Sequence, residues 1–149
     1  MKRAMLVLAL GVLALSASSC AGQGAGGGTV EVAVREWQVA PAQNSIRTGT
    51  VNFIVTNEGA ETHELLVVKA DSADQLPVDA DGAFDEAAYG ADKVMGEVED
   101  ISPTTQKNFA LDLEPGNYLL LCNVVDDEAS GEKDAHFSHG MYATFTVEP

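Results

Sequence analysis

The 149-residue chain is acidic and poor in cysteine. It holds 23 Asp and Glu residues against eight Lys and Arg, so its formal net charge is −15, and 46% of its residues are hydrophobic. This length suits a single domain with one hydrophobic core. The negative charge repels nucleic acid and anionic lipid headgroups, which excludes nucleic-acid binding as an expected function.

The first 19 residues have the pattern of an export signal. Lys2 and Arg3 precede an apolar run over residues 4–15, and small residues follow at 16–19. The run is shorter than the roughly 20 residues of a membrane-spanning helix, so residues 1–19 are predicted to be a signal peptide. Its removal changes the formal net charge from −15 to −17, because two of the eight basic and none of the 23 acidic residues are lost.

Cys20 directly follows these small residues. The stretch Ala17-Ser18-Ser19-Cys20 resembles the bacterial lipobox, in which the cysteine is lipidated, although Ala17 stands where Leu is commoner. Cleavage near the same place without a lipid is the alternative. The Gly-, Ala- and Gln-rich residues up to 28 are predicted to form, with Cys20, a flexible tether over residues 20–28. We therefore expect an exported domain over residues 29–149, lipid-anchored at the outer face of the cytoplasmic membrane or free in the periplasm.

Most of residues 29–149 show the period-two alternation of β-strands. Apolar residues alternate with polar or small ones over 30–35, 51–56, 109–113 and 142–147. The runs 63–68 and 117–122 are apolar on both faces, as expected of strands buried between layers. Six or seven short strands without a sustained helical period predict an all-β fold, a β-sandwich with Greek-key connections.

Two acidic stretches interrupt the strand pattern and are interpreted as loop insertions. Residues 71–100 are rich in Ala and acidic side chains, and a short helix is expected around residues 84–89, where flanking glycines limit its length. Residues 124–135 contain the run Asp126-Asp127-Glu128. Both insertions fall between predicted strands.

Cys122 ends one of the buried strands and has no internal partner if Cys20 lies in the tether. A lone thiol in an oxidising compartment calls for an explanation, and metal binding supplies one. His136 and Met141 follow shortly before the last strand, and His63 is the only histidine outside this loop. Thiolate, thioether and imidazole donors together suit copper. Zinc also takes sulfur and nitrogen ligands, but the methionine favours copper.

Each candidate ligand also has a plainer interpretation. Met141 and Cys122 can be core residues, His63 can be an ordinary polar residue at a strand edge, and His139 competes with His136 for one position. The aromatic residues Trp37, Tyr118 and Phe137 are interpreted as packing residues rather than electron relays.

The run from Tyr118 to Cys122, followed by His136-Phe137-x-x-Gly140-Met141, resembles the ligand pattern of the cupredoxins, a family of small copper proteins. The resemblance implies one type 1 copper per domain, with Cys122, His136 and His63 in the trigonal plane and Met141 as a weak axial ligand. The chain departs from the pattern where Glu64 follows the first histidine in place of an Asn.

The second departure is length, because thirteen residues separate Cys122 from His136 where the family commonly has only a few. Lengthening the loop costs roughly 1.3 kcal/mol in closure entropy, which is small beside a metal-binding free energy of about 10 kcal/mol. The insertion therefore does not prevent a site from forming.

The resemblance implies a one-electron carrier rather than an enzyme, working with a redox partner protein that the acidic surface predicts to be basic. Delivery or sequestration of Cu(I) by the same ligands is one alternative, and a metal-free β-sandwich that docks a partner is another. Multicopper enzymes need more histidines than the three in this chain.

Overall fold

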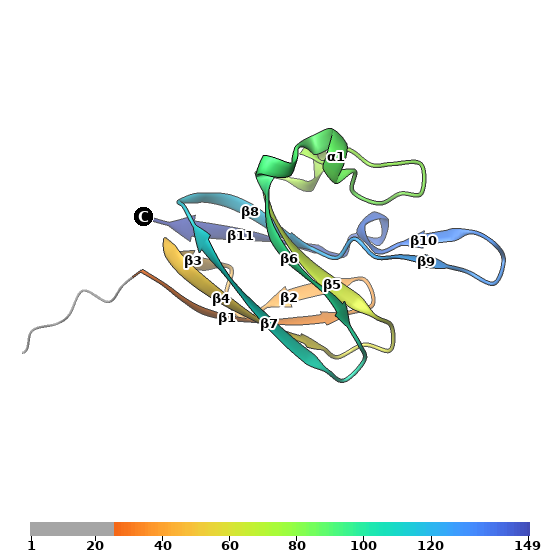
Figure 1. Ribbon diagram of the computed structural model, residues 1–149, viewed down its shortest axis with the longest axis horizontal. Coiled ribbons are helices and arrows are strands. Elements are labelled where there is room, and N and C mark those ends of the chain that lie inside the picture. Colours follow the sequence, from red (N-terminus) through yellow and green to blue (C-terminus); the bar gives the residue numbers. More distant parts are fainter. Residues whose placement is uncertain (1–25) are drawn as a thin grey trace, which may run out of the picture.

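The computed structural model describes residues 26–149, so the predicted signal peptide and Cys20 lie outside the described residues. Within this range the chain forms two facing β-sheets, a separate two-stranded ribbon and a few short helical turns (Figure 1). No helix among these residues has the length and apolar character needed to cross a membrane. The all-β sandwich predicted from the sequence is confirmed.

The first sheet contains four strands in the order β2-β1-β4-β7. Their bounds are Gln38–Pro41 for β2, Gly27–Arg35 for β1, Gly49–Asn57 for β4 and Gln106–Leu113 for β7. β1 runs parallel to β4, and the other pairs are antiparallel. β1 begins two residues before the predicted domain boundary, and a Cβ on Gly27 would lie only 2.1 Å from the Thr50 carbonyl oxygen. Only a glycine fits there.

The second sheet contains five strands in the order β3-β11-β8-β5-β6. Their bounds are Ser45–Arg47 for β3, Tyr142–Glu148 for β11, Gly116–Leu121 for β8, His63–Lys69 for β5 and Val94–Ile101 for β6. The ribbon pairs β9 (Val125–Asp127) with β10 (Lys133–Ala135). The described residues thus hold eleven strands rather than six or seven, because β2, β3, β9 and β10 are too short to show an alternation and β6 lies within the first acidic stretch.

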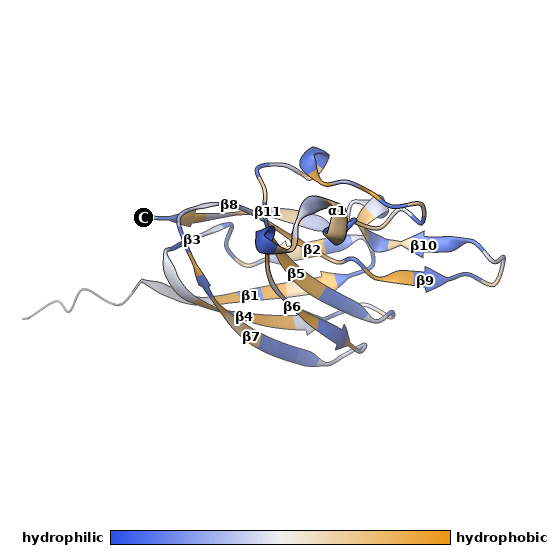
Figure 2. Cartoon of the chain, turned by 45° about the horizontal axis from the view of Figure 1, so that its top comes forward, coloured by the Kyte–Doolittle hydropathy of each residue, from blue (hydrophilic) through white to orange (hydrophobic). Residues whose placement is uncertain are grey.

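The main core lies between the two sheets. It is built from the inward-facing residues of both sheets, including Val30, Phe53, Leu65 and Phe145, all of which are almost completely buried. Figure 2 shows hydrophobic residues concentrated along the strands of the sandwich, whereas β10 is largely hydrophilic. Burial of these side chains is the main force that holds the sheets together.

A second apolar cluster lies on the other face of the second sheet. Leu66 and Leu119 belong to it, together with Phe84 and Phe137 from outside the sheet. The cover comes from the connection after β5, which holds η1 (Ala73–Gln75), α1 (Glu86–Tyr89) and η2 (Ala91–Lys93). This cover explains why β5 and β8 are apolar on both faces.

The two predicted insertions differ from expectation in their extent. The first ends at residue 93, because residues 94–101 form β6 and pair with β5. The predicted short helix is present as α1, one turn capped by the Asp85 side chain, which accepts a hydrogen bond from the Ala88 N–H. The second insertion is a β-ribbon rather than an irregular loop.

Candidate metal centre

Three buried side chains, those of His63, Cys122 and His136, meet at one end of the sandwich. His63 is the first residue of β5, and Cys122 directly follows β8, the strand paired with β5. His136 opens the turn η3 (His136–His139), after the ribbon, and its N–H donates to the Val124 carbonyl at 3.0 Å. The ribbon therefore leaves the site after Cys122 and returns to it at His136.

The donor atoms of these residues have the separations that a bound metal ion requires. The two Nδ1 atoms of His63 and His136 are 3.2 Å apart, and the Cys122 Sγ lies 3.8 and 3.4 Å from them. Bonds of about 2.0 Å to nitrogen and about 2.3 Å to sulfur would separate such donors by about 3.3–3.8 Å. The group can hold one metal ion without a large rearrangement.

The backbone of Met141 is hydrogen-bonded to two residues of this group. Its N–H donates to the His136 carbonyl at 3.2 Å, and its carbonyl accepts from the Cys122 N–H at 3.0 Å. The side chain is fully buried in the main core cluster, which also contains Cys122. This position suits either a core residue or a neighbour of the metal, so the axial role of Met141 stays a prediction.

His139, the competitor of His136, lies outside the donor group. Its side chain is about half exposed, and its Nε2 lies 2.5 Å from Asp134 Oδ1. Both histidines belong to η3, but only His136 points into the protein. The turn therefore brings one imidazole to the site and leaves the other at the surface.

Glu64 braces the site where the cupredoxin pattern has an Asn. Its N–H donates to the Cys122 Sγ at 3.5 Å, and its Oε1 accepts from the Asn123 N–H at 3.0 Å. Burial raises the pKa of Glu64 to about 7. The carboxyl group thereby ties the start of β5 to the residue after the cysteine.

Asn123 extends this bracing to the connection after β5. Its side-chain Oδ1 accepts from the Phe84 N–H at 2.7 Å, and its Nδ2 donates to the Phe84 carbonyl at 3.0 Å. These two bonds fix the chain just before α1 to the residue that follows Cys122. Sequence reasoning missed Asn123, although its place directly after the cysteine was a usable signal.

Carboxylates face the outer nitrogens of both histidines. His136 Nε2 lies 3.3 Å from Asp126 Oδ2 and 3.6 Å from Glu61 Oε2, and His63 Nε2 lies 3.6 Å from Glu36 Oε1. A carboxylate at the second nitrogen orients a metal-binding imidazole. Of the three acids, only Asp126 lies in a segment that the sequence singled out, and nothing in the sequence spacing pointed to Glu36 or Glu61.

The two acids at the edge of the site have opposite pKa shifts. Hydrogen bonds from backbone N–H groups, first its own and then those of Glu61 and Ala60, lower the pKa of Glu36. Its Oε1 accepts from the Ala60 N–H at 2.6 Å and from the Glu61 N–H at 2.8 Å. Burial raises the pKa of Glu61, and nearby carboxylates add to the effect. Glu36 is therefore the more firmly ionised of the two.

Burial favours the uncharged forms of two of the metal-free donors, Cys122 and His63. Burial raises the pKa of Cys122 to about 12, although N–H groups of Glu64 and Val124 partly offset it. Burial, with repulsion from His136, lowers the pKa of His63. A neutral imidazole is already the ligand form, whereas the thiol has to release its proton when a metal binds.

Trp37 covers the outer side of His136. The two rings meet edge to face, with centroids 5.3 Å apart, and the indole also lies over His139 at 4.1 Å. Trp37 has a positive φ of 62° in the turn between β1 and β2. A bulky side chain rarely adopts this left-handed conformation.

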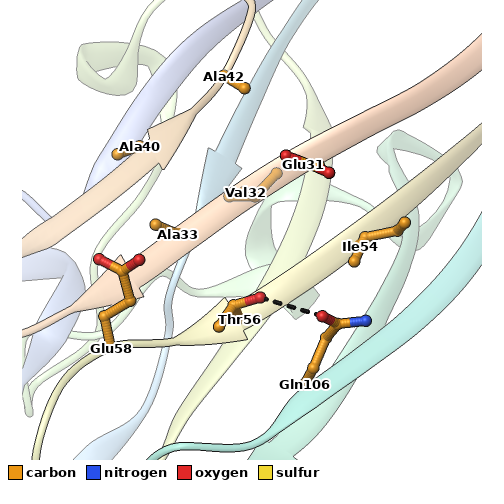
Figure 3. Close-up of a pocket in the computed structure, with 9 residues that line it drawn as sticks. All are labelled: Glu31, Val32, Ala33, Ala40, Ala42, Ile54, Thr56, Glu58 and Gln106. Carbon is orange, nitrogen blue, oxygen red and sulfur yellow. Dashed lines mark hydrogen bonds between the residues drawn. The ribbon is translucent and has the colours of Figure 1, made fainter.

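A hollow elsewhere on the molecule is unrelated to this group. It lies on the first sheet, among residues of β1, β2, β4 and β7, and Thr56 Oγ1 donates across it to Gln106 Oε1 at 3.4 Å (Figure 3). None of the residues that line it is His, Cys or Met. It therefore offers no soft metal ligand.

Comparison with known proteins finds the same fold in solved structures. No family model and no curated protein sequence matches the chain. Dithionite-reduced auracyanin from the photosynthetic bacterium Roseiflexus castenholzii superposes with a TM-score of 0.57 at 20% identity, over 81% of this chain and 97% of that one. Auracyanin A, a "blue" copper protein from Chloroflexus aurantiacus, gives 0.56 at 18% identity, over 83% and 100% of the two chains.

Rusticyanin from Thiobacillus ferrooxidans is a third similar structure, with a TM-score of 0.51 at 17% identity, over 80% of this chain and 77% of that one. All three neighbours are cupredoxins. At these identities the similarity concerns the arrangement of the strands. The chain therefore has the cupredoxin fold, and its buried His63, Cys122 and His136 form a group that can hold one metal ion.

Proposed function

We propose that the protein is a mononuclear type 1 copper protein that carries one electron at a time. The observation that supports this most strongly is the buried group of His63, Cys122 and His136, whose donor atoms lie 3.2–3.8 Å apart. One thiolate and two imidazoles are the donor set of blue-copper sites. The fold is shared with auracyanin A, a copper protein.

The protein's own groups suit electron transfer. All three donors are fully buried and already close together, so little movement is needed when a metal binds. Hydrogen bonds of Glu64 hold the Cys122 sulfur and the Asn123 N–H directly after it. Copper held there would supply a one-electron redox couple, and Met141 is proposed as its weak axial ligand.

Retention of copper fits this geometry better than delivery. A protein that hands Cu(I) to a partner has to expose its ligands to the acceptor, whereas the three donors here have no solvent-exposed surface. Full burial and bracing support a site that keeps its metal and exchanges electrons.

We also propose an exported location and a basic redox partner. The N-terminal pattern supports export with a lipid at Cys20, and the excess of acidic side chains favours a positively charged partner. The export proposal is tested by labelling cells with radioactive palmitate. Loss of the labelled band in Cys20→Ser, but not in Cys122→Ser, is the expected result.

The copper proposal is tested by visible absorption and metal analysis. The full chain, expressed with its own export signal, is purified, loaded with Cu(II) and freed of excess metal. We expect one copper per chain and an intense thiolate-to-copper absorption band. Cys122→Ser should abolish this band, whereas Cys20→Ser, the matched control, should keep it.

Two other results would contradict the electron-carrier proposal. Stoichiometric Cu(I) binding without a coloured Cu(II) form would indicate copper handling. Absence of binding of either copper ion would indicate a metal-free sandwich that acts through its surface.

A further inference from the structure

None of the candidate ligands reaches the solvent. His63, Cys122, His136 and Met141 have no exposed surface among the described residues. An external electron donor therefore cannot touch a ligand ring directly. If the proposed function holds, an electron has to pass through a residue that covers the site.

Trp37 is the residue with the right contacts. It is 39% exposed, and its ring packs edge to face against His136 at 5.3 Å. The other exposed large hydrophobic residues of the described range are Val78 and Tyr142. The Tyr142 ring packs on Phe137, and among the aromatic pairs of the described residues the rings of His63 and His136 meet only each other and Trp37. Trp37 alone among them joins the solvent to an imidazole of the donor group.

The conformation of Trp37 is held by the turn that carries it. Arg35 and Gln38 pair as the ends of β1 and β2, and Arg35 Nε donates to Gln38 Oε1 at 2.7 Å. The turn keeps Trp37 at φ 62°, which an aromatic residue adopts only under constraint from its surroundings. Such strain is commonest at functional positions. The fold thus retains an unfavourable backbone conformation that leaves the indole between solvent and His136.

The surface beside Trp37 is acidic. Glu61 and Asp126 lie at the Nε2 of His136, and Asp134 lies at the Nε2 of His139, the second imidazole that the indole contacts. The nearby basic side chains are already paired, Arg35 with Glu58 at 3.6 Å and Lys133 with Asp127 at 2.5 Å. The uncompensated charge at this surface is negative.

We propose that Trp37 is the electron port of the protein and that the surface around it binds a positively charged redox partner. The inference rests on the proposed function. One electron leaves the reduced partner, which is oxidised, and passes by way of the indole and His136 to reduce Cu(II) to Cu(I). No bond to Trp37 forms or breaks, and no proton is transferred. The carboxylates hold the cationic face of the partner against the indole.

The test measures how fast copper-loaded protein is reduced by small complexes of opposite charge. The full chain is mixed with hexaammineruthenium(II), a cation, or hexacyanoferrate(II), an anion, and loss of the thiolate-to-copper band gives the second-order rate. The variants are Trp37→Leu, Trp37→Phe and the control Tyr142→Leu, because Tyr142 is an aromatic residue with the same exposed fraction as Trp37, 39%. The reduction potential of each variant is measured so that rates are compared at equal driving force.

We expect Trp37→Leu to slow reduction by both complexes several-fold, Trp37→Phe to keep most of the rate, and Tyr142→Leu to leave it unchanged. After correction for driving force, the cation should react with the wild type at least about tenfold faster than the anion. A wild-type rate in Trp37→Leu with the band intact would overturn the port. If that variant loses the band, the comparison rests on Trp37→Phe and Tyr142→Leu, and a larger loss of rate in Tyr142→Leu than in Trp37→Phe would overturn the port.

The partner assignment fails separately if the wild type reacts no faster with the cation than with the anion. Failure of the proposed function is distinguishable from both results. In that case the loaded wild type shows no thiolate-to-copper band, and this is established before any variant is compared.

Discussion

Individual residues around the donor group show how this chain departs from a simple ligand pattern. Glu64 replaces an amide with a carboxyl group, yet it still binds the N–H of Asn123 and donates its own N–H to the Cys122 sulfur. An Asn side chain is shorter and cannot ionise. The brace is retained, but it has become titratable.

The stability of the metal-free protein should therefore depend on Glu64 and pH. The folded pKa of about 7 lies above the ordinary 4.5, so the folded protein binds a proton more tightly than the unfolded chain. Stability from this group is present at low pH and is lost as pH rises from about 4.5 to about 7. Urea unfolding across this window should show a smaller decline in Glu64→Gln than in the wild type.

Glu97→Gln is the matched control for this pH effect. Glu97 is a largely exposed acid on the neighbouring strand β6, and partial burial raises its pKa as well. Its substitution should change the pH profile less than Glu64→Gln does. Equal profiles for the wild type and Glu64→Gln would contradict the assignment.

Asp126 should tune the reduction potential of copper-loaded protein. Its carboxylate lies 3.3 Å from the outer nitrogen of His136, where negative charge favours Cu(II) over Cu(I). Asp126→Asn should therefore raise the potential measured by redox titration. Asp127→Asn removes the same charge from the adjacent residue, whose side chain is 80% exposed and paired with Lys133. This variant should raise the reduction potential much less. Equal shifts would indicate a general charge effect.

At the level of elements, the two acidic segments form parts of the structure. The connection over residues 71–93 covers the outer face of the second sheet, and the ribbon β9–β10 carries Asp126 to His136 and then leads into η3. The large separation between Cys122 and His136 is therefore filled by a regular ribbon. Through Asp126, this ribbon also covers the Nε2 side of the His136 imidazole.

Phe84 should be the main packing residue of the cover over the second sheet. It is 2% exposed, and its ring contacts those of Tyr89 and Phe137. Phe84→Ala should lower the free energy of unfolding by about 3–5 kcal/mol, because a buried aromatic side chain is replaced by a cavity. Val78→Ala, in the same connection but 55% exposed, should change it by less than about 0.5 kcal/mol. Urea unfolding of both variants provides the comparison.

The sequence predicted the elements whose pattern is long and regular. The alternating valines of β1 and β4 and the doubly apolar runs of β5 and β8 identified the sandwich, because burial determines those positions. β6 was missed, since an exposed strand with Glu97 and Glu99 resembles an acidic loop. The ribbon was missed for the same reason.

The candidate ligands were predictable because their residue types are rare and chemically specific. The donor atoms of His63, Cys122 and His136 come together as expected. The backbone of Met141 is hydrogen-bonded to those of His136 and Cys122. The acids at the outer nitrogens were not predictable. Glu36 and Glu61 reach the histidines only through tertiary packing, and the chain contains 23 acidic residues with no local pattern to mark these two.

The whole molecule carries far more negative than positive charge. The described residues contain all 23 acidic and only six of the eight basic side chains. Such an excess destabilises the compact state through repulsion between like charges, and salt screens it. The thermal midpoint of the metal-free protein, followed by circular dichroism, should therefore rise as sodium chloride is added. A midpoint that stays constant or falls would show that the charges are locally compensated.

The direction of β1 determines the orientation that a membrane-anchored domain would take. It runs from Gly27, near the C-terminal strand, to Arg35, next to Glu36 and Trp37, and nine residues of strand extend roughly 27 Å (Figure 1). If a lipid at Cys20 holds the chain, the anchored pole and the metal-binding pole lie at opposite ends of the domain. Trp37 then faces the aqueous space. A soluble partner can reach it directly from the aqueous space, whereas a membrane-embedded partner makes contact only if it projects beyond the domain.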